Sequence, residues 1–224
     1  MKVTQVIDLS HPLQPGREAR RLEISRLPAT DITGAAPEAD WYIMHSVDMA
    51  NHLGTHLEVP YHCLPDGADL AQVPVEQFAG EALILDLRGY PAGTGIPAED
   101  VQRAAQRAGG IQAGDILFCM TGWSQYYGAP QYKQPPFLTG TAIRWLIEQG
   151  IKVLGIDTMG VMDPDVPDRQ NHLPLFQAGL VYIENLANLE AIPHSRVIVA
   201  ALPPAIHGLE AFPVRVVALL GQSS

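Results

Sequence analysis

The chain has 224 residues, 47% of them hydrophobic, and carries a formal net charge of −10 at pH 7. This length is enough for one domain with a sizeable core, and no Gly/Ser-rich or charged run divides it. The negative charge repels phosphate backbones and anionic membranes, so neither nucleic acid nor a membrane is expected as a partner. The chain lacks an apolar run near the ~20 residues of a membrane span, a secretory signal and a close-spaced cysteine pair, so we predict a soluble, cytoplasmic protein.

Apolar patterns along the chain predict several short strands and few helices. One helix is expected at 97–108, which begins with proline and precedes a Gly-Gly pair, and another at 139–149, which ends before Gly150. The segment 12–41 is rich in turn formers and arginines without a period, so we expect an irregular lid or an arm that reaches a neighbouring protomer. These elements indicate a mixed α/β protein, with strands at 3–9, 82–87, 115–119, 152–156, 180–183, 196–200 and 214–220.

The segment 52–62 reads His-Leu-Gly-Thr-His-Leu-Glu-Val-Pro-Tyr-His, with its ionisable side chains on even positions: His52, His56, Glu58 and His62. In an extended chain, a period of two places all four on one face. Imidazole nitrogen and carboxylate oxygen are the donors of zinc, manganese and iron(II) sites, so the pattern indicates a metal site. A straight strand would separate His52 from His62 by about 33 Å. We therefore predict a strand that breaks into a loop at Gly54 and Pro60.

Two other interpretations of this segment remain open. A helix would place His52 and His56 one turn apart, although Gly54, Val59 and Pro60 make a poor helix. The histidines could also be unrelated surface or core residues, which is the ordinary explanation for one histidine alone. Three imidazoles and a carboxylate on one face favour the metal site.

The segment resembles the signature His-x-Gly-Thr-His-x-Asp-x-Pro-x-His of the metal-dependent cyclase and hydrolase family that includes bacterial kynurenine formamidase and isatin hydrolase. Every fixed position matches except Glu58, where the family usually has Asp. The resemblance covers nearly the whole chain, because 7–13, 80–87, 121–123 and 155–157 also look like segments of that family. It implies the swivelling β/β/α fold, with mixed sheets and few helices in a single domain spanning 1–224.

By resemblance, the metal ligands are His52, His56, Glu58, His172 and Glu184. His172 and Glu184 lie twelve residues apart, and this spacing alone is weak evidence for a metal site. A capped surface helix would explain the two residues as well. Imidazole and carboxylate without thiolate suit Zn²⁺ or Mn²⁺. The set could hold one metal or two metals bridged by Glu58; we favour one, because the longer Glu58 side chain can chelate or point aside instead of bridging.

His62 is, by resemblance, a catalytic acid/base and not a ligand. An imidazole with a pKa near 6.5 can take a proton from a metal-activated water and return it to the leaving group. The sequence has no Gly-x-Ser-x-Gly nucleophile elbow, which disfavours a Ser-His-Asp hydrolase. Thr55 and Asp157 are candidates for orienting the ligands through hydrogen bonds.

The aromatic residues Trp41, Tyr42 and Trp123 lie near segments that the family places beside the metal. Their rings are candidates for stacking on an aromatic substrate. A hydrophobic core or a subunit interface would explain them equally well.

The sequence thus predicts a metal-dependent hydrolase of an amide, lactam or lactone carbonyl in a small molecule, acting on C–N bonds other than peptide bonds. The resemblance also implies a homodimer or homotetramer. One alternative is a non-hydrolytic cyclase or dehydratase of a polyketide-like pathway, in which His62 removes a proton next to a metal-bound carbonyl. Another is a non-catalytic module that binds a metal or small ligand.

Overall fold

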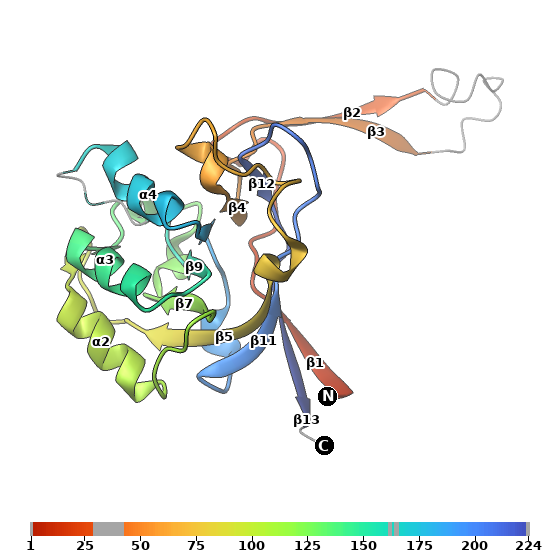
Figure 1. Cartoon of the computed structure of the whole chain (residues 1–224). Helices are drawn as coiled ribbons and strands as arrows, with labels where there is room; N and C mark the ends of the chain where they lie inside the picture. The colour runs from red at the N-terminus through yellow and green to blue at the C-terminus, as the bar shows by residue number, and fades with distance from the viewer. Residues whose placement is uncertain (1, 29–42, 161–162, 164–165, 223–224) are drawn as a thin grey trace.

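The computed structural model describes residues 2–28, 43–160, 163 and 166–222. Within these ranges, one curled sheet (Figure 1) has the strand order β1 (Lys2–Asp8), β13 (Val217–Gln222), β11 (Arg196–Ala200), β5 (Ala79–Asp86), β7 (Ile116–Met120), β9 (Val153–Ile156), β10 (Val181–Glu184), β4 (His56–Glu58), β12 (Ala211–Pro213). The strands β5, β7, β9 and β10 run parallel, and the flanking strands pair antiparallel. Each predicted strand is present, with ends shifted by at most three residues.

The helices α2 (Ala98–Arg107), α3 (Gly140–Glu148) and α4 (Asp168–Gln177) cover one face of the parallel strands (Figure 1). The first two confirm the predicted helices. Alternate strand residues divide between two apolar cores: Leu83 and Leu85 face the helices, whereas Ala82 and Ile84 face the interior of the curled sheet. Strands buried on both faces explain the nearly continuous apolar runs in the sequence.

The sequence did not predict α4, the helix that carries His172. Pro174 lies inside this helix and removes one backbone donor, and the helix shows almost no separation of apolar and polar faces. Packing against the rest of the protein therefore overrides a weak local signal. None of the helices that the structure describes is long and apolar enough to cross a membrane.

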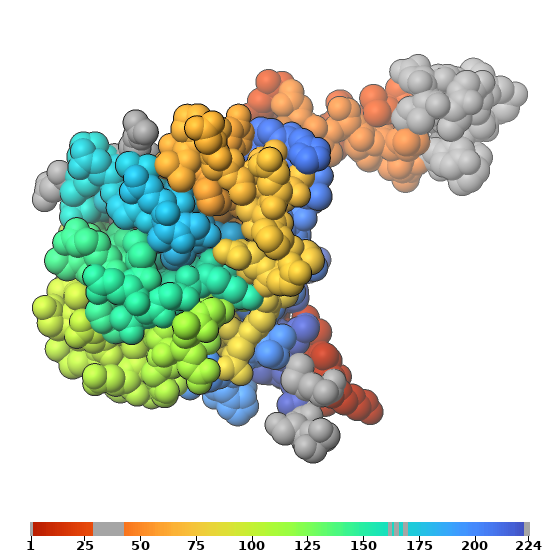
Figure 2. All heavy atoms as spheres, viewed as in Figure 1, coloured from red at the N-terminus to blue at the C-terminus, as the bar shows by residue number. Residues whose placement is uncertain are grey.

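Strand β2 (Leu22–Leu27) pairs antiparallel with β3 (Met44–Met49), and this hairpin projects from the body of the protein (Figures 1 and 2). The prediction that 12–41 is irregular is therefore wrong for β2. The pairing partner lies beyond that range, so the local pattern carried little information about the strand. The hairpin is mostly exposed, with Ile24 and Val47 opposite each other. A second small sheet pairs β6 (Gly95–Ile96) with β8 (Phe137–Leu138).

Candidate metal centre

Strand β4 brings part of the histidine-rich segment into the main sheet, between β10 and β12. Its register with β10 sets His56 directly opposite Glu184. Directly opposed residues of an antiparallel pair project from the same face of a sheet. Two side chains separated by 128 positions in the sequence therefore meet because of strand pairing.

The predicted bends of this segment are both present. Gly54 takes the left-handed backbone conformation, with φ of 56°, immediately before β4. After β4, the chain turns into the short 3-10 helix η2 (Pro60–His62), which has proline in its first turn. These bends bring the ring centres of His52 and His62 to 4.7 Å from each other.

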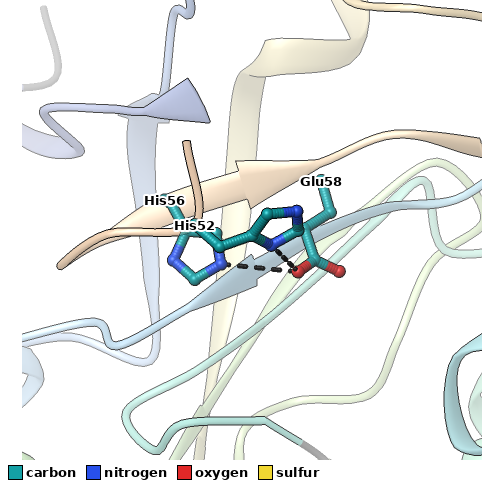
Figure 3. A group of neighbouring side chains, drawn as sticks. All are labelled: His52, His56 and Glu58. Carbon is teal, nitrogen blue, oxygen red and sulfur yellow. Dashed lines mark hydrogen bonds and ion pairs between the residues drawn. The ribbon is translucent and has the colours of Figure 1, made fainter. Parts of the chain in front are cut away.

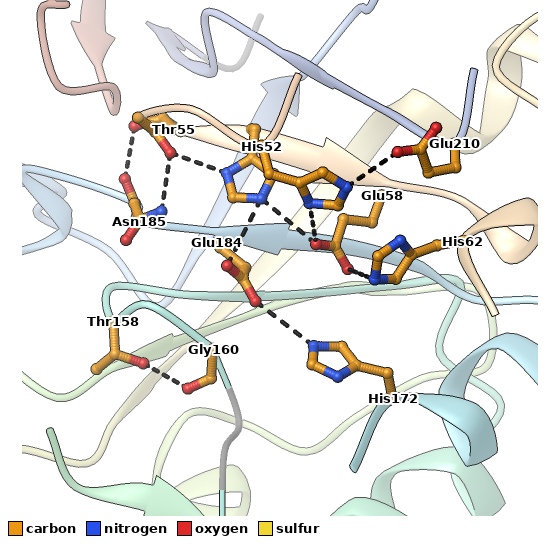
Figure 4. A network of polar contacts seen from close by, with 12 residues as sticks. His52, Thr55, Glu58, His62, Thr158, Gly160, His172, Glu184, Asn185 and Glu210 are labelled. Atoms are coloured by element: carbon orange, nitrogen blue, oxygen red, sulfur yellow. Dashed lines mark hydrogen bonds and ion pairs between the residues drawn. The ribbon is translucent and has the colours of Figure 1, made fainter. Parts of the chain in front are cut away.

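The side chains of the segment converge on Glu58. His52 Nδ1 lies 2.8 Å and His56 Nε2 3.4 Å from the same oxygen, Glu58 Oε1 (Figure 3). The ion-pair contacts continue from His56 Nε2 to Glu184 Oε2 at 3.6 Å, and from Glu184 Oε1 to His172 Nε2 at 3.6 Å (Figure 4). The structure thus brings the five candidate ligands into one connected cluster.

Two overlapping groups in this cluster have metal-binding geometry. Donor atoms of His52, His56 and Glu58 lie within 4.8 Å of one another, and the same holds for Glu58, His172 and Glu184. Glu58 is common to both groups. The geometry therefore accommodates one ion in either group, or two ions that share Glu58, and the role of each residue as a ligand stays a prediction.

Buried atoms without hydrogen-bond partners test whether this cluster fits a cation. His56 Nδ1 is 2.9 Å from the carbonyl oxygen of Gly54, an acceptor, so the proton belongs on Nδ1 and the lone pair on Nε2. Among the residues that the structure describes, the buried atoms His56 Nε2 and Glu58 Oε2 have no hydrogen-bond partner. Orphaned polar atoms in a protein interior are costly unless something pairs with them. A bound cation would satisfy both.

The two carboxylates differ in their electrostatics. Burial alone would raise the pKa of Glu58, but the neighbouring imidazoles of His52 and His56 outweigh it and hold this pKa well below its usual range. The pKa of Glu184 is raised by burial and by the charge of Glu58, against the opposing effects of His172 and His56. A divalent cation would relieve the repulsion between these carboxylates.

Hydrogen bonds hold the backbone around the segment. The buried Thr55 hydroxyl donates to the carbonyl of Asn185 at 2.5 Å and accepts from the backbone N–H of His11 at 2.9 Å. The Asn185 side chain donates to the carbonyl of Gly54 at 2.8 Å. Thr55 therefore supports the ligands through the backbone rather than by touching them.

Asp157 has a different place from the one expected. It accepts hydrogen bonds from the backbone N–H groups of Thr121 and Gly122 and from the Thr121 hydroxyl. These bonds shape the loop that leads into Trp123, whose ring packs edge-on against Tyr126 at 4.8 Å. Asp157 thus holds the loop that carries Trp123, one of the predicted substrate-binding residues. Trp41 and Tyr42, the other two predicted substrate residues, lie outside the described residues.

His62 lies at the rim of the cluster. Its Nε2 is 4.0 Å from Glu58 Oε2, and its side chain is 27% exposed, compared with 4% for His56. Burial lowers the pKa of His62, partly opposed by the charge of Glu58. The ring packs edge-on against His172 and Phe176 of α4. His62 is thus the histidine of the motif most open to solvent.

Glu210 is a residue of this site that the sequence did not predict. It directly precedes β12 and lies 3.2 Å, through Oε1, from His52 Nε2. Donor atoms of His52, His62 and Glu210 also lie within 4.8 Å of one another. A lone glutamate 158 positions away from its histidine partner carries no signal in sequence, because only the pairing of β12 with β4 brings the two together.

The family model described as “Putative cyclase” matches residues 7–163. The chain belongs to the cyclase family. A kynurenine formamidase of Bacillus cereus is 25% identical over 97% of this chain and 98% of its own length. Isatin hydrolase A from Labrenzia aggregata, solved with benzyl benzoate, is 26% identical with a TM-score of 0.82, over 97% of this chain and 94% of that one.

A third relative is a solved structure described as a potential metal-dependent hydrolase with cyclase activity. It is 25% identical with a TM-score of 0.75, and the match covers 98% of this chain and 99% of that chain. These similarities confirm the predicted family and its mixed α/β fold with few helices.

Proposed function

We propose that this cyclase-family protein is a metal-dependent hydrolase that adds water to the carbonyl of a small amide, lactam or lactone, breaking C–N bonds other than peptide bonds. The observation that carries the proposal is the cluster around Glu58, with its orphaned buried atoms His56 Nε2 and Glu58 Oε2 and the partly exposed His62 at its rim. The names of the similar proteins, a kynurenine formamidase and an isatin hydrolase, support this reaction class.

The residues that would hold the metal are His52, His56, Glu58, His172 and Glu184. Their nitrogen and oxygen donors, without thiolate, suit Zn²⁺ or Mn²⁺. A cation there would supply Lewis-acid polarisation of the carbonyl and acidification of water. The protein itself supplies the proton transfer and the orientation of the substrate.

His62 is the proposed acid/base. Because burial lowers its pKa, the imidazole is neutral at pH 7 and can accept a proton from water that attacks the carbonyl. The resulting imidazolium then protonates the leaving nitrogen or oxygen. Glu58 Oε2 lies 4.0 Å from His62 Nε2 and stabilises the positive charge of the imidazolium between the two proton transfers. Partial exposure leaves the ring open to a substrate.

The proposed substrate is small and aromatic. Kynurenine and isatin, named in the similar proteins, are both aromatic compounds. Trp123, on the loop held by Asp157, is a candidate to stack on such a ring. Trp41 and Tyr42 remain predictions for the same role.

We also propose a homodimer or homotetramer in which the β2–β3 hairpin reaches a neighbouring protomer. The apolar residues Ile24, Ile43 and Val47 are 50–75% exposed on this projection. A second copy would cover them. Light scattering at micromolar concentration should give at least twice the mass of the chain; a monomer would exclude this assembly. A cytoplasmic location is part of the same proposal.

A second candidate function is a non-hydrolytic cyclisation or dehydration, favoured by the description of one relative as having cyclase activity. In that reaction, His62 would remove a proton next to the carbonyl. The two candidates differ in the fate of water, since only hydrolysis places solvent oxygen in the acid product.

Activity is tested with metal-free protein reconstituted with Zn²⁺ or Mn²⁺. N-formyl arylamines and isatin serve as probes, in water labelled with ¹⁸O, with product mass as the readout. We expect metal-dependent turnover and one labelled oxygen per product. The exposed His194 gives a matched control, because His194→Ala should keep full activity while His62→Ala loses most of it. Turnover without labelled oxygen would support the cyclase; binding without turnover would support the non-catalytic module.

A further inference from the structure

The ring of His52 lies between two carboxylates that approach its two nitrogens. Nδ1 is 2.8 Å from Glu58 Oε1, and Nε2 is 3.2 Å from Glu210 Oε1 (Figure 4). Glu58 belongs to both candidate ligand groups of the proposed metal centre, whereas Glu210 has no part in the mechanism given above. The contact between Glu210 and His52 Nε2 therefore needs a separate explanation.

A neutral imidazole carries one proton, and only the other nitrogen has a lone pair for a metal. If the proton is on Nε2, it is donated to Glu210, and Nδ1 presents its lone pair beside Glu58 Oε1. If the proton is on Nδ1, it points at Glu58 instead. His52 then has no lone pair on that side and cannot act as a metal ligand together with His56 and Glu58. Glu58 and Glu210 both accept hydrogen bonds only, but a cation held by Glu58 would take the place of a proton on Nδ1 and so would favour the first arrangement.

Other contacts hold Glu210 in this place. The Asn51 side chain donates to the same oxygen, Glu210 Oε1, at 2.6 Å. The backbone N–H of Val59 donates to the Glu210 carbonyl at 2.9 Å, and the next residue, Ala211, pairs with Glu58 in the sheet. The sheet that positions Glu58 thus also fixes Glu210. The Gly54 carbonyl plays the corresponding role for His56, because it accepts the proton on Nδ1.

We infer that Glu210 is a positioning residue: it accepts the Nε2 proton of His52, so that Nδ1 faces the metal. This inference rests on the proposed metal centre. A different role, as a ligand of another cation with His52 and His62, is less compatible with the contacts, because Oε1 already accepts from Asn51 and faces His52 Nε2. Metal-binding histidines commonly donate their second ring N–H to a carboxylate, and losing that partner typically weakens metal affinity by about 10–100-fold.

The test measures Zn²⁺ binding without substrate, by competition with a chromophoric chelator. Glu210→Ala should raise the Zn²⁺ dissociation constant by about 10–100-fold at unchanged stoichiometry. Glu210→Gln keeps an oxygen acceptor and should recover part of the loss. The exposed Glu190 offers a matched control, and Glu190→Ala should bind as the wild type does. Asn51→Ala should weaken binding less than Glu210→Ala and add little to it in the double variant, because both act through one oxygen.

The tautomer of His52 is a readout that a merely structural role would not move. Long-range ¹H–¹⁵N spectra of the Zn²⁺-loaded wild type should show His52 with its proton on Nε2. Glu210→Ala should lose that uniform state, and Glu210→Gln, which keeps an oxygen acceptor, should retain it in part. Unchanged affinity and tautomer in both variants would overturn the inference, and loss of one bound equivalent would make Glu210 a ligand instead. If the wild type itself bound no Zn²⁺, the metal centre would fail before the role of Glu210 was in question.

Discussion

Thr55→Val removes one buried hydroxyl while keeping the shape of the side chain. Two backbone groups lose their bonds to this hydroxyl: the N–H of His11 and the carbonyl of Asn185. Leaving a buried polar group without its partner costs about 1–3 kcal/mol, so the two together cost about 1–5 kcal/mol after the small gain from an added methyl. The hydroxyl lies between His52 and His56 in the sequence, so the loss falls on the backbone that carries the candidate ligands.

The assay is urea unfolding of the metal-free protein in the presence of a chelator. Thr55→Val should lower the unfolding free energy by about 1–5 kcal/mol without a change in the urea slope. Thr55→Ser is the matched control, because it keeps the hydroxyl and loses only a buried methyl, at about 1 kcal/mol. If Thr55→Val were as stable as Thr55→Ser, the hydrogen bonds of Thr55 would not be what holds this segment.

Separate variants give distinct signatures for the ligands, the acid/base and the half-buried His11. His56→Ala should lose metal and activity together, whereas His62→Ala should keep its metal while kcat falls by about 10²–10⁴; equal metal loss would make His62 a ligand. Glu58→Asp withdraws the carboxylate by about 1.5 Å and should weaken Zn²⁺ binding about tenfold in chelator competition, and unchanged affinity would contradict the contacts with His52 and His56. Burial lowers the pKa of His11 from 6.5 to about 4, so the stability gained from its neutral form is complete above about pH 6.5 and is lost as the pH falls through about 4. Metal-free wild type should therefore lose about 1–2 kcal/mol more than His11→Phe between pH 7 and pH 4, after allowance for partial exposure, and parallel unfolding profiles would refute this.

The part of the site that could be predicted from sequence is the part built by nearby residues. The period of two across His52, His56 and Glu58, with Gly54 and Pro60 as bending residues, indicated a metal-type cluster in a broken strand, and the structure has that geometry. Local patterns also located most strands and two helices, because buried parallel strands are nearly continuous apolar runs.

The rest of the site depends on contacts between distant parts of the chain. Glu184 meets His56 through strand pairing, and Glu210 meets His52 because β12 pairs with β4. No local pattern encodes such a register. His172 and Glu184 were identified only through the resemblance to a family, and the helix that carries His172 was missed because Pro174 and an even mixture of polar and apolar residues obscure it.

The most direct test of the metal centre is anomalous diffraction from crystals of the protein loaded with Zn²⁺, recorded on both sides of the zinc absorption edge. We expect one strong peak, with nitrogen or oxygen atoms of His52, His56 and Glu58 at about 2.0–2.2 Å from it. His172 and Glu184 should line the same site. A second peak bridged by Glu58 would keep the centre and replace the single ion with two. A strongest peak beyond coordination distance of both His56 and Glu58 would contradict the metal centre, and with it the hydrolytic mechanism.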